Sequence, residues 1–229
     1  MMPSKNEENF SRSLTGGLRI FFGGTFDPPH LGHDFILRSL CEDTLTESVH
    51  LVPTRVNPLK STQPQGNPEV RLRWVKLWLA NIKTQISESH DRKIHLETFE
   101  IESPLNSASF SYDSLTLLKK KWGGQWALSG GADLLADLEK WHRVDELLGN
   151  LHSLWIFNRS GMGDDPLTAF SSCELSKFCS LRVMSRNAPL MSSTEIRNLL
   201  KGNNASREKL KQALIPSVYE DLVQGVGAL

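Results

Sequence analysis

The chain has few cysteines and no long hydrophobic run, and both absences exclude classes of protein. Its 229 residues include three cysteines, Cys41, Cys173 and Cys179, and no two of them have C-x-x-C spacing. This spacing argues against a zinc site and a disulfide framework, so we expect no metal ligands, reduced thiols and a cytoplasmic location. No hydrophobic run has the length of a membrane span, and residues 1–12 lack the apolar core of a signal peptide. We therefore expect a soluble protein with no membrane partner.

The chain also lacks an excess of charge of either sign. Lysine and arginine together number 26, as do aspartate and glutamate. Without a global positive field the protein does not recruit nucleic acid or an anionic membrane surface, so we expect neither as a partner. A site for a small anion needs only a few cations close to it. The sequence leaves the oligomeric state open, a homo-oligomer included.

Short apolar runs alternate with helical patterns along the chain. The runs predict strands at residues 18–22, 48–52, 93–97, 126–129, 152–157 and 180–184. The helical patterns lie at residues 31–41, 69–82, 111–121, 133–138, 144–148, 194–201 and 217–224. This alternation predicts an α/β fold that is Rossmann-like and doubly wound, with a mostly parallel sheet and helices on both faces. In such a sheet the ligand binds beyond the carboxyl ends of the strands, at the switch point of the strand order.

The length of the chain suits one α/β domain rather than two independent ones. Residues 1–17 are polar, end in Thr-Gly-Gly and show no periodicity, which predicts a disordered tail before a single domain at residues 18–229. We expect the polar run at residues 83–92 to be a surface turn, and the segment after the fifth strand to be a loop rich in Gly, Asp and Pro. Ser111 is the predicted N-cap of its helix.

Residues 23–33 carry the most informative pattern, Gly-Gly-Thr-Phe-Asp-Pro-Pro-His-Leu-Gly-His, directly after the first predicted strand. Glycines let backbone N–H groups approach a phosphate closely, and the following helix presents unsatisfied N–H groups and its positive dipole end. His30 and His33, spaced H-x-G-H, are then placed to donate hydrogen bonds to phosphate oxygens. Histidines that are merely polar residues of a strand, turn and helix would explain an isolated H-x-G-H, but not the whole pattern. We expect Asp27 to shape the turn by accepting backbone hydrogen bonds.

A second pattern, Met-Ser-Ser-Thr-Glu-Ile-Arg at residues 191–197, predicts the start of a helix. Ser192, Ser193 or Thr194 would cap this helix, and Arg197 would lie one turn in. An ordinary cap followed by a surface arginine accounts for the pattern as well as a phosphate site does. In the phosphate site, hydroxyls and N–H groups hold the β- and γ-phosphates while the planar guanidinium of Arg197 neutralises leaving pyrophosphate.

In this order the two patterns resemble the signatures of the nucleotidyltransferase superfamily with H-x-G-H, most closely the family of bacterial nicotinate-nucleotide adenylyltransferases. The resemblance extends from about residue 18 to the C-terminus. It implies an enzyme that joins nicotinate mononucleotide and ATP into nicotinate adenine dinucleotide and pyrophosphate, a step of NAD synthesis. It also implies Mg²⁺ as the companion of ATP, held mainly by ATP oxygens and waters because no carboxylate cage is evident.

The resemblance assigns roles to individual residues. It implies that His30, His33, Lys60 and Arg197 hold the triphosphate and stabilise the transition state. No general base is needed, since the acceptor phosphate is already ionised. Lys60 ends a segment similar to the family's P-x-x-x-P-P-H-K loop, from which this chain departs by having Asn57 and Leu59. The residues implied to bind ATP are Gly23, Gly24, Thr25, Phe26, Gly131, Asp133, Ser192, Ser193 and Thr194.

Two further segments resemble the family's pyridine-nucleotide site. Residues 109–114 are similar to (S/T)-Y-T-x-(D/Q)-T, and residues 131–133 with 141–142 are similar to G-(A/Q)-D…W-(Y/H). A helix N-terminus favours the carboxylate of nicotinate over a neutral carboxamide, and an indole offers a face on which a pyridine can stack. A capped amphipathic helix and a core tryptophan would explain both segments without a ligand. The implied pyridine-nucleotide residues are Ser109, Phe110, Ser111, Trp141, His142 and Arg159.

Two alternatives remain open from the sequence. The same chemistry could act on nicotinamide mononucleotide or phosphopantetheine, although phosphopantetheine enzymes resemble only a shorter chain. The fold could also serve as a non-catalytic nucleotide-binding module. The presence of His30, His33 and Arg197 argues against the module, because a pure binder does not need to hold the leaving group.

Overall fold

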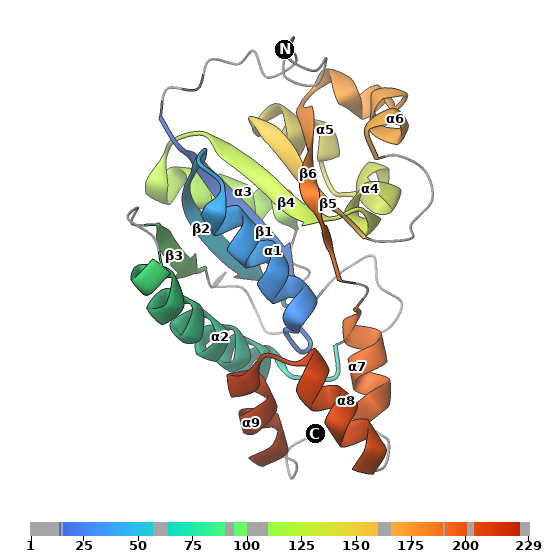
Figure 1. Ribbon diagram of the computed structural model, residues 1–229. Coiled ribbons are helices and arrows are strands. Elements are labelled where there is room, and N and C mark those ends of the chain that lie inside the picture. Colours follow the sequence, from blue (N-terminus) through green and yellow to red (C-terminus); the bar gives the residue numbers. More distant parts are fainter. Residues whose placement is uncertain are drawn as a thin grey trace, which may run out of the picture.

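Figure 1 shows the computed structural model, which describes Leu14 and residues 16–56, 64–89, 94–99, 110–159, 166–189, 191–200 and 204–224. The strands among these residues are β1 (Leu18–Gly24), β2 (Thr46–Pro53), β3 (His95–Thr98), β4 (Trp126–Gly131), β5 (Ser153–Arg159) and β6 (Ser180–Ala188). They form one sheet in the order β3-β2-β1-β4-β5-β6, and every neighbouring pair is parallel. The strand order reverses between β1 and β4, which is the switch point of a doubly wound sheet. The predicted Rossmann-like fold is confirmed.

Helices cover both faces of this sheet. The described helices are α1 (Leu31–Glu42), α2 (Pro68–Ser89), α3 (Ser111–Trp122), α4 (Asp133–Asp137), α5 (Val144–Gly149), α6 (Pro166–Ser171), α7 (Ser193–Leu200), α8 (Asn204–Ala213) and α9 (Pro216–Gln224). Two short 3₁₀ helices, η1 (Leu138–Lys140) and η2 (Glu174–Lys177), complete the set. In Figure 1, α1 crosses one face of the sheet and α3 lies behind it.

Side chains of β1 alternate between two hydrophobic cores, one on each face of the sheet. Leu18, Ile20 and Phe22 are buried in a core with residues of α1, α2 and α9, whereas Phe21 is buried in a second core with residues of α3 and α5. This alternation follows from the two-residue period of a strand. It leaves the carboxyl end of β1 between two helical layers, where a ligand can be enclosed.

Three stretches differ from the sequence prediction. The helix α2 continues to Ser89, so the predicted surface turn over residues 83–92 is wrong for its described part. Ile82 and Ile86 are buried one turn apart and extend the apolar face of α2, which outweighs the polar residues between them. The helices α6 and α8 were not predicted, and both bury apolar side chains in a core.

The start of the described chain touches the core. Leu14, which lies in the predicted disordered tail, packs against the core that contains Leu18. Residues 1–13 and Thr15 lie outside the described residues, so the tail and the domain boundary stay predictions. Among the residues that are described, no helix combines the length and apolar character needed to cross a membrane.

A buried histidine on β2 makes the fold sensitive to acid. The side chain of His50 is 2 % exposed and contacts the rings of Trp122 and Trp126, at centroid distances of 4.7 and 4.8 Å. Burial, with a smaller contribution from the positive charge of Arg19, lowers the pKa of His50 from 6.5 to about 4. The native protein therefore keeps His50 neutral at a pH where the unfolded chain protonates it.

We expect His50 to reduce the free energy of unfolding as the pH falls. Between pH 6.5 and about 4 the unfolded chain binds a proton that the native state does not, so stability is lost at ~1.4 kcal/mol per pH unit. Urea unfolding at pH 7 and pH 5 should show an acid loss that is about 2 kcal/mol larger in the wild type than in His50→Gln, whose side chain does not titrate. Equal losses in the two proteins would contradict this prediction.

Candidate active site

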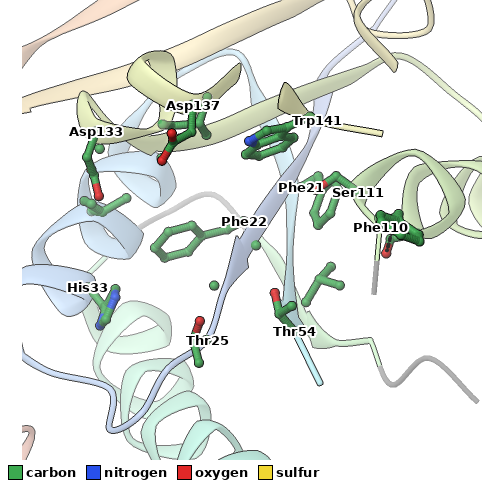
Figure 2. A pocket seen from close by; sticks show the side chains of 18 of the residues that line it. Phe21, Phe22, Thr25, His33, Thr54, Phe110, Ser111, Asp133, Asp137 and Trp141 are labelled. Atoms are coloured by element: carbon green, nitrogen blue, oxygen red, sulfur yellow. Dashed lines mark hydrogen bonds between the residues drawn. The ribbon is translucent and has the colours of Figure 1, made fainter. Parts of the chain in front are cut away.

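A cavity of about 550 Å³ opens at the carboxyl ends of β1, β2 and β4, at the switch point of the sheet. It is lined by ten of the residues predicted from the sequence: Gly23, Gly24, Thr25, His33, Phe110, Ser111, Gly131, Asp133, Trp141 and His142. Figure 2 shows His33 and Asp133 toward one end of the cavity and Phe110 with Ser111 toward the other. Residues about a hundred positions apart in the sequence thus line one cavity.

The two histidines of the H-x-G-H pattern cap the helix α1 between them. His30 is its N-cap and accepts the backbone N–H of Gly32 at Nδ1 (3.1 Å), while its own N–H donates to Nδ1 of His33 (3.3 Å). A neutral imidazole that accepts at Nδ1 carries its proton on Nε2. Both rings are therefore fixed in the tautomer that can donate a hydrogen bond from Nε2.

Aromatic rings hold His33 in place. Its imidazole stacks on that of His30 with a centroid distance of 3.7 Å and meets Phe26 edge-on at 5.1 Å. The indole of Trp78, which is fully buried, lies 6.4 Å from His33 and donates its N–H to the Asp34 carboxylate at 2.7 Å. Phe26 and His30 are 0 % and 3 % exposed and do not line the cavity, so they contact His33 on the side of its ring that faces the protein interior.

Two glycines of the first pattern are needed for close approach. A Cβ on Gly24 would lie 2.9 Å from the ring of Phe26, and a Cβ on Gly32 would lie 3.0 Å from the imidazole of His30. Phe26 itself has a positive φ of 48°. Neighbouring side chains already fill the space that a Cβ would need at Gly24 and Gly32, so only glycine fits at these two positions without a shift.

The helix α7 presents Arg197 to this turn from the far end of the chain. One guanidinium nitrogen of Arg197 donates to the backbone oxygen of Asp27 (2.9 Å) and lies 3.4 Å from its carboxylate. The other donates to the hydroxyl of Thr194 at 2.9 Å. Asp27 does accept backbone N–H groups, but these belong to residues 65 and 66 rather than to its own turn.

The hydroxyl groups at the start of α7 already have protein partners. Ser192 forms a capping box with Glu195: its N–H and hydroxyl donate to the Glu195 carboxylate, and its hydroxyl accepts the Glu195 N–H. The Ser193 hydroxyl donates to the backbone oxygen of Pro28, and the Thr194 hydroxyl accepts from Arg197. These three residues, predicted to bind ATP, do not line the cavity.

At the opposite end of the cavity, two segments bring aromatic rings together. The ring of Phe110 lies 4.4 Å from that of His142, and Trp141 is half-buried beside them. The predicted cap of α3 is wrong by one residue, because Phe110 is the N-cap and Ser111 is the first helical residue. The Phe110 side chain makes no capping hydrogen bond, so the first-turn N–H groups of α3 have no acceptor in the side chain of the N-cap residue.

Some predicted site residues cannot be placed. Lys60, with Asn57 and Leu59 beside it, and Ser109 lie outside the described residues, as does the side chain of Arg159. Within the part of the chain that is described, no group of three or more His, Cys, Asp or Glu side chains could hold a metal ion.

The sequence analysis missed two features of the site. Asp137 and Lys140 also line the cavity, and they form an ion pair at 2.7 Å. Arg71 of α2 is 1 % exposed and donates to backbone oxygens next to the cavity, including that of Thr54, which lines it. The sequence could have indicated this buried charge. Arg71 has the helical spacing of Trp74, Val75 and Trp78, which puts its charge on the buried face of α2.

Comparisons with known proteins agree with this geometry. The model of the family described as Cytidylyltransferase-like matches residues 21–199. The chain is 33% identical over 146 residues to a probable nicotinate-nucleotide adenylyltransferase of Aquifex aeolicus, an alignment covering 63% of this chain and 79% of that protein. A relative of the same name from Geobacillus thermodenitrificans is 33% identical over 128 residues, and the chain spans about half of its length, 54%, with 56% of this chain aligned.

A solved structure shares the fold. The Plasmodium falciparum nicotinic acid mononucleotide adenylyltransferase complexed with NaAD superimposes with a TM-score of 0.65 at 20% sequence identity. The superposition covers 91% of this chain and 95% of that one. At this identity the likeness concerns the fold.

Proposed function

Because the chain belongs to the cytidylyltransferase-like family, we propose that it transfers the adenylyl group of ATP to nicotinate mononucleotide. The products are nicotinate adenine dinucleotide and pyrophosphate, and the reaction is a step of NAD synthesis. Relatives named as nicotinate-nucleotide adenylyltransferases support this choice within the family. The observation that carries the proposal is that Thr25 after β1 and His33 of α1 line the same cavity as Phe110 and Trp141.

The reaction is an in-line displacement at the α-phosphorus of ATP. An oxygen of the acceptor phosphate forms the new P–O bond while the bond to the β-phosphate oxygen breaks, and pyrophosphate leaves with that electron pair. No proton has to be removed from a phosphate that is ionised near neutral pH. The protein therefore contributes position and charge stabilisation. Imidazole and guanidinium donors suit this task, and a pair of catalytic carboxylates is not required.

We assign the triphosphate to the end of β1 and the start of α1. The backbone of Gly23, Gly24 and Thr25 lines the cavity there. His33 donates from Nε2 to a phosphate oxygen, and His30, stacked on it, holds the His33 ring in place, while the phosphate contact predicted for His30 stays a prediction. Arg197, Ser192, Ser193 and Thr194 lie beside this turn, where Arg197 neutralises the leaving pyrophosphate. Gly131 and Asp133, at the end of β4, face the nucleoside of ATP.

The pyridine end of the acceptor is assigned to the wall formed by Phe110, Ser111, Trp141 and His142. Trp141 supplies a flat face for the ring. The start of α3 supplies N–H groups that the side chain of its N-cap residue, Phe110, does not bond, and with them the positive end of the helix dipole. A carboxylate gains more from this environment than a neutral carboxamide does, so we propose nicotinate over nicotinamide. The roles predicted for Lys60, Ser109 and Arg159 remain predictions.

ATP enters the site as its magnesium complex. Among the described residues, Asp133 and Asp137 are the carboxylates that line the cavity, and Asp137 is paired with Lys140. This donor set fits an ion held mainly by phosphate oxygens and water. The cytoplasmic location and a homo-oligomeric state are likewise proposals.

Pyrophosphate release with MgATP tests the assignment of the acceptor. We expect turnover with nicotinate mononucleotide, and kcat/KM about 10-fold or more lower with nicotinamide mononucleotide because the carboxylate contact is lost. Phosphopantetheine should give none. Preference for another acceptor would overturn the acceptor assignment, and release with none of the three would overturn the enzymatic function in favour of a binding module.

A further inference from the structure

A buried carboxylate links the phosphate-binding turn to two other segments of the chain. Asp27 is 2 % exposed, and its two oxygens accept the backbone N–H groups of Gln65 (2.8 Å) and Gly66 (2.9 Å). The oxygen bonded to Gln65 also lies 3.4 Å from the guanidinium of Arg197, which donates to the Asp27 backbone at 2.9 Å. One side chain therefore fixes both the chain before α2 and the guanidinium that comes from α7.

A buried guanidinium from α2, that of Arg71, also contacts the turn after β1 and the chain before α2. Arg71 donates to four backbone oxygens: those of Gly66 (3.0 Å), Thr25 (2.8 Å), Thr54 (2.6 Å) and Arg55 (2.8 Å). Thr25 follows β1 and Thr54 follows β2, and both residues line the cavity. The planar guanidinium thus holds the ends of two neighbouring strands at a fixed separation.

Gly66 joins the two charged side chains. Its N–H donates to Asp27 and its carbonyl accepts from Arg71. A Cβ at this position would lie 2.9 Å from the Asp27 carboxylate and 3.1 Å from Cγ of Arg71, so both side chains close on the same residue. Burial lowers the pKa of Arg71, and the negative charge of Asp27 opposes that shift. Each charge thus lessens the cost of burying the other.

We propose that Asp27 and Arg71 are positioning residues of the active site, which together set the orientation of Arg197 and the separation of the cavity-lining residues Thr25 and Thr54. This inference rests on the proposed function. Both side chains are buried and bonded to backbone groups of the protein, and we assign neither of them a contact with substrate. Their effect on the reaction passes through the groups that they hold.

Asp27→Asn tests the role of the carboxylate. The amide cannot accept at both positions, and its NH₂ group would face an N–H or guanidinium donor. We expect kcat for pyrophosphate release to fall about 100-fold, with a much smaller change in the KM for ATP, because the displaced Arg197 acts on the leaving group. Asp221→Asn is the matched control. Asp221 accepts three N–H groups from Arg73 and Trp74 on α2, so its loss should lower Tm without lowering kcat.

A double-mutant cycle separates positioning from general weakening of the fold. If Asp27 acts through Arg197, Asp27→Asn should change kcat by only about threefold or less in an Arg197→Ala background. Arg71→Lys keeps the charge but cannot reach four carbonyls, and should also lower kcat at an unchanged fold by circular dichroism. Equal losses of kcat in both backgrounds, wild-type kcat in Arg71→Lys, or an equal loss in Asp221→Asn would overturn the inference.

The inference can fail separately from the proposed function. If the wild type releases no pyrophosphate with any acceptor, the proposed function fails. The network is then tested by the rise in Tm on adding MgATP. A rise that is smaller in Asp27→Asn than in Asp221→Asn supports positioning of the nucleotide site, and equal rises overturn it.

Discussion

Replacing His33 by alanine is expected to lower kcat for pyrophosphate release about 10³-fold. His33 lines the cavity, and its Nδ1 accepts the backbone N–H of His30, so a neutral ring carries its proton on Nε2, from which we expect it to donate to the phosphate. The charge on the phosphate oxygens is greatest in the transition state, so the lost donor costs more there than in the ground state. Affinity for ATP should therefore fall by only about 10-fold.

Steady-state kinetics and calorimetric titration with an unreactive ATP analogue measure the two quantities independently. His152→Ala is a suitable control, because His152 is 5 % exposed and immediately precedes β5, at the amino end of that strand and away from the cavity. It should lower stability while leaving kcat near the wild-type value. Losses of kcat/KM and of affinity that are equal in His33→Ala would show that the imidazole serves binding alone.

The strands and the turn after β1 could be predicted from the sequence because both depend on residues that are close together in the chain. Each predicted strand lies within an observed one or overlaps it, since a buried parallel strand must be a short apolar run. The turn after β1 was readable for a similar reason. Gly24 and Gly32 stand where a Cβ would meet Phe26 or His30, so the pattern that marks the phosphate site is also the pattern that the backbone requires.

The cap of α7 was predictable from a local rule. The residues at its start satisfy S-x-x-E, the signature of a capping box, and Ser192 and Glu195 form that box. The sequence analysis predicted such a cap and left a phosphate site equally open, and the assignment of these hydroxyl groups to ATP stays a prediction. The helix α6 was missed although Pro166 is its first residue, a position that proline favours. There the local rule was available and composition was given more weight.

The network around Asp27 lies beyond sequence reasoning for a physical reason. Asp27 contacts residues 38 and 39 positions away and another 170 positions away, and Arg71 reaches back 46 positions to Thr25. No periodicity or spacing encodes such contacts, because they exist only once the sheet has brought β1, β2 and α7 together. The only sign of these contacts in the sequence was Arg71, a charged residue on the apolar face of α2.

Arg197→Ala is the second substitution for which we expect a large effect, a loss of about 10²- to 10³-fold in kcat. Its guanidinium is held by the Asp27 backbone and the Thr194 hydroxyl, so it reaches the reaction already oriented. Arg197→Lys should recover only part of this loss, because a point charge cannot replace a fork that bonds two oxygens. Inhibition by added pyrophosphate should weaken in parallel with kcat, since the same oxygens are bound in the transition state and in the product.

Arg73→Ala provides the comparison, because Arg73 is also a helix arginine bonded to an aspartate, Asp221, but that aspartate belongs to α9 rather than to the turn after β1. A loss in Arg197→Ala no greater than in Arg73→Ala would return Arg197 to the role of an ordinary helix arginine, which the sequence alone left equally open. The other informative outcome is an Arg197→Ala variant whose kcat is reduced but which pyrophosphate still inhibits as strongly as it inhibits the wild type. It would show that Arg197 orders the turn before His30 rather than contacting the leaving group, and the charge on pyrophosphate would then have to be met by the histidines.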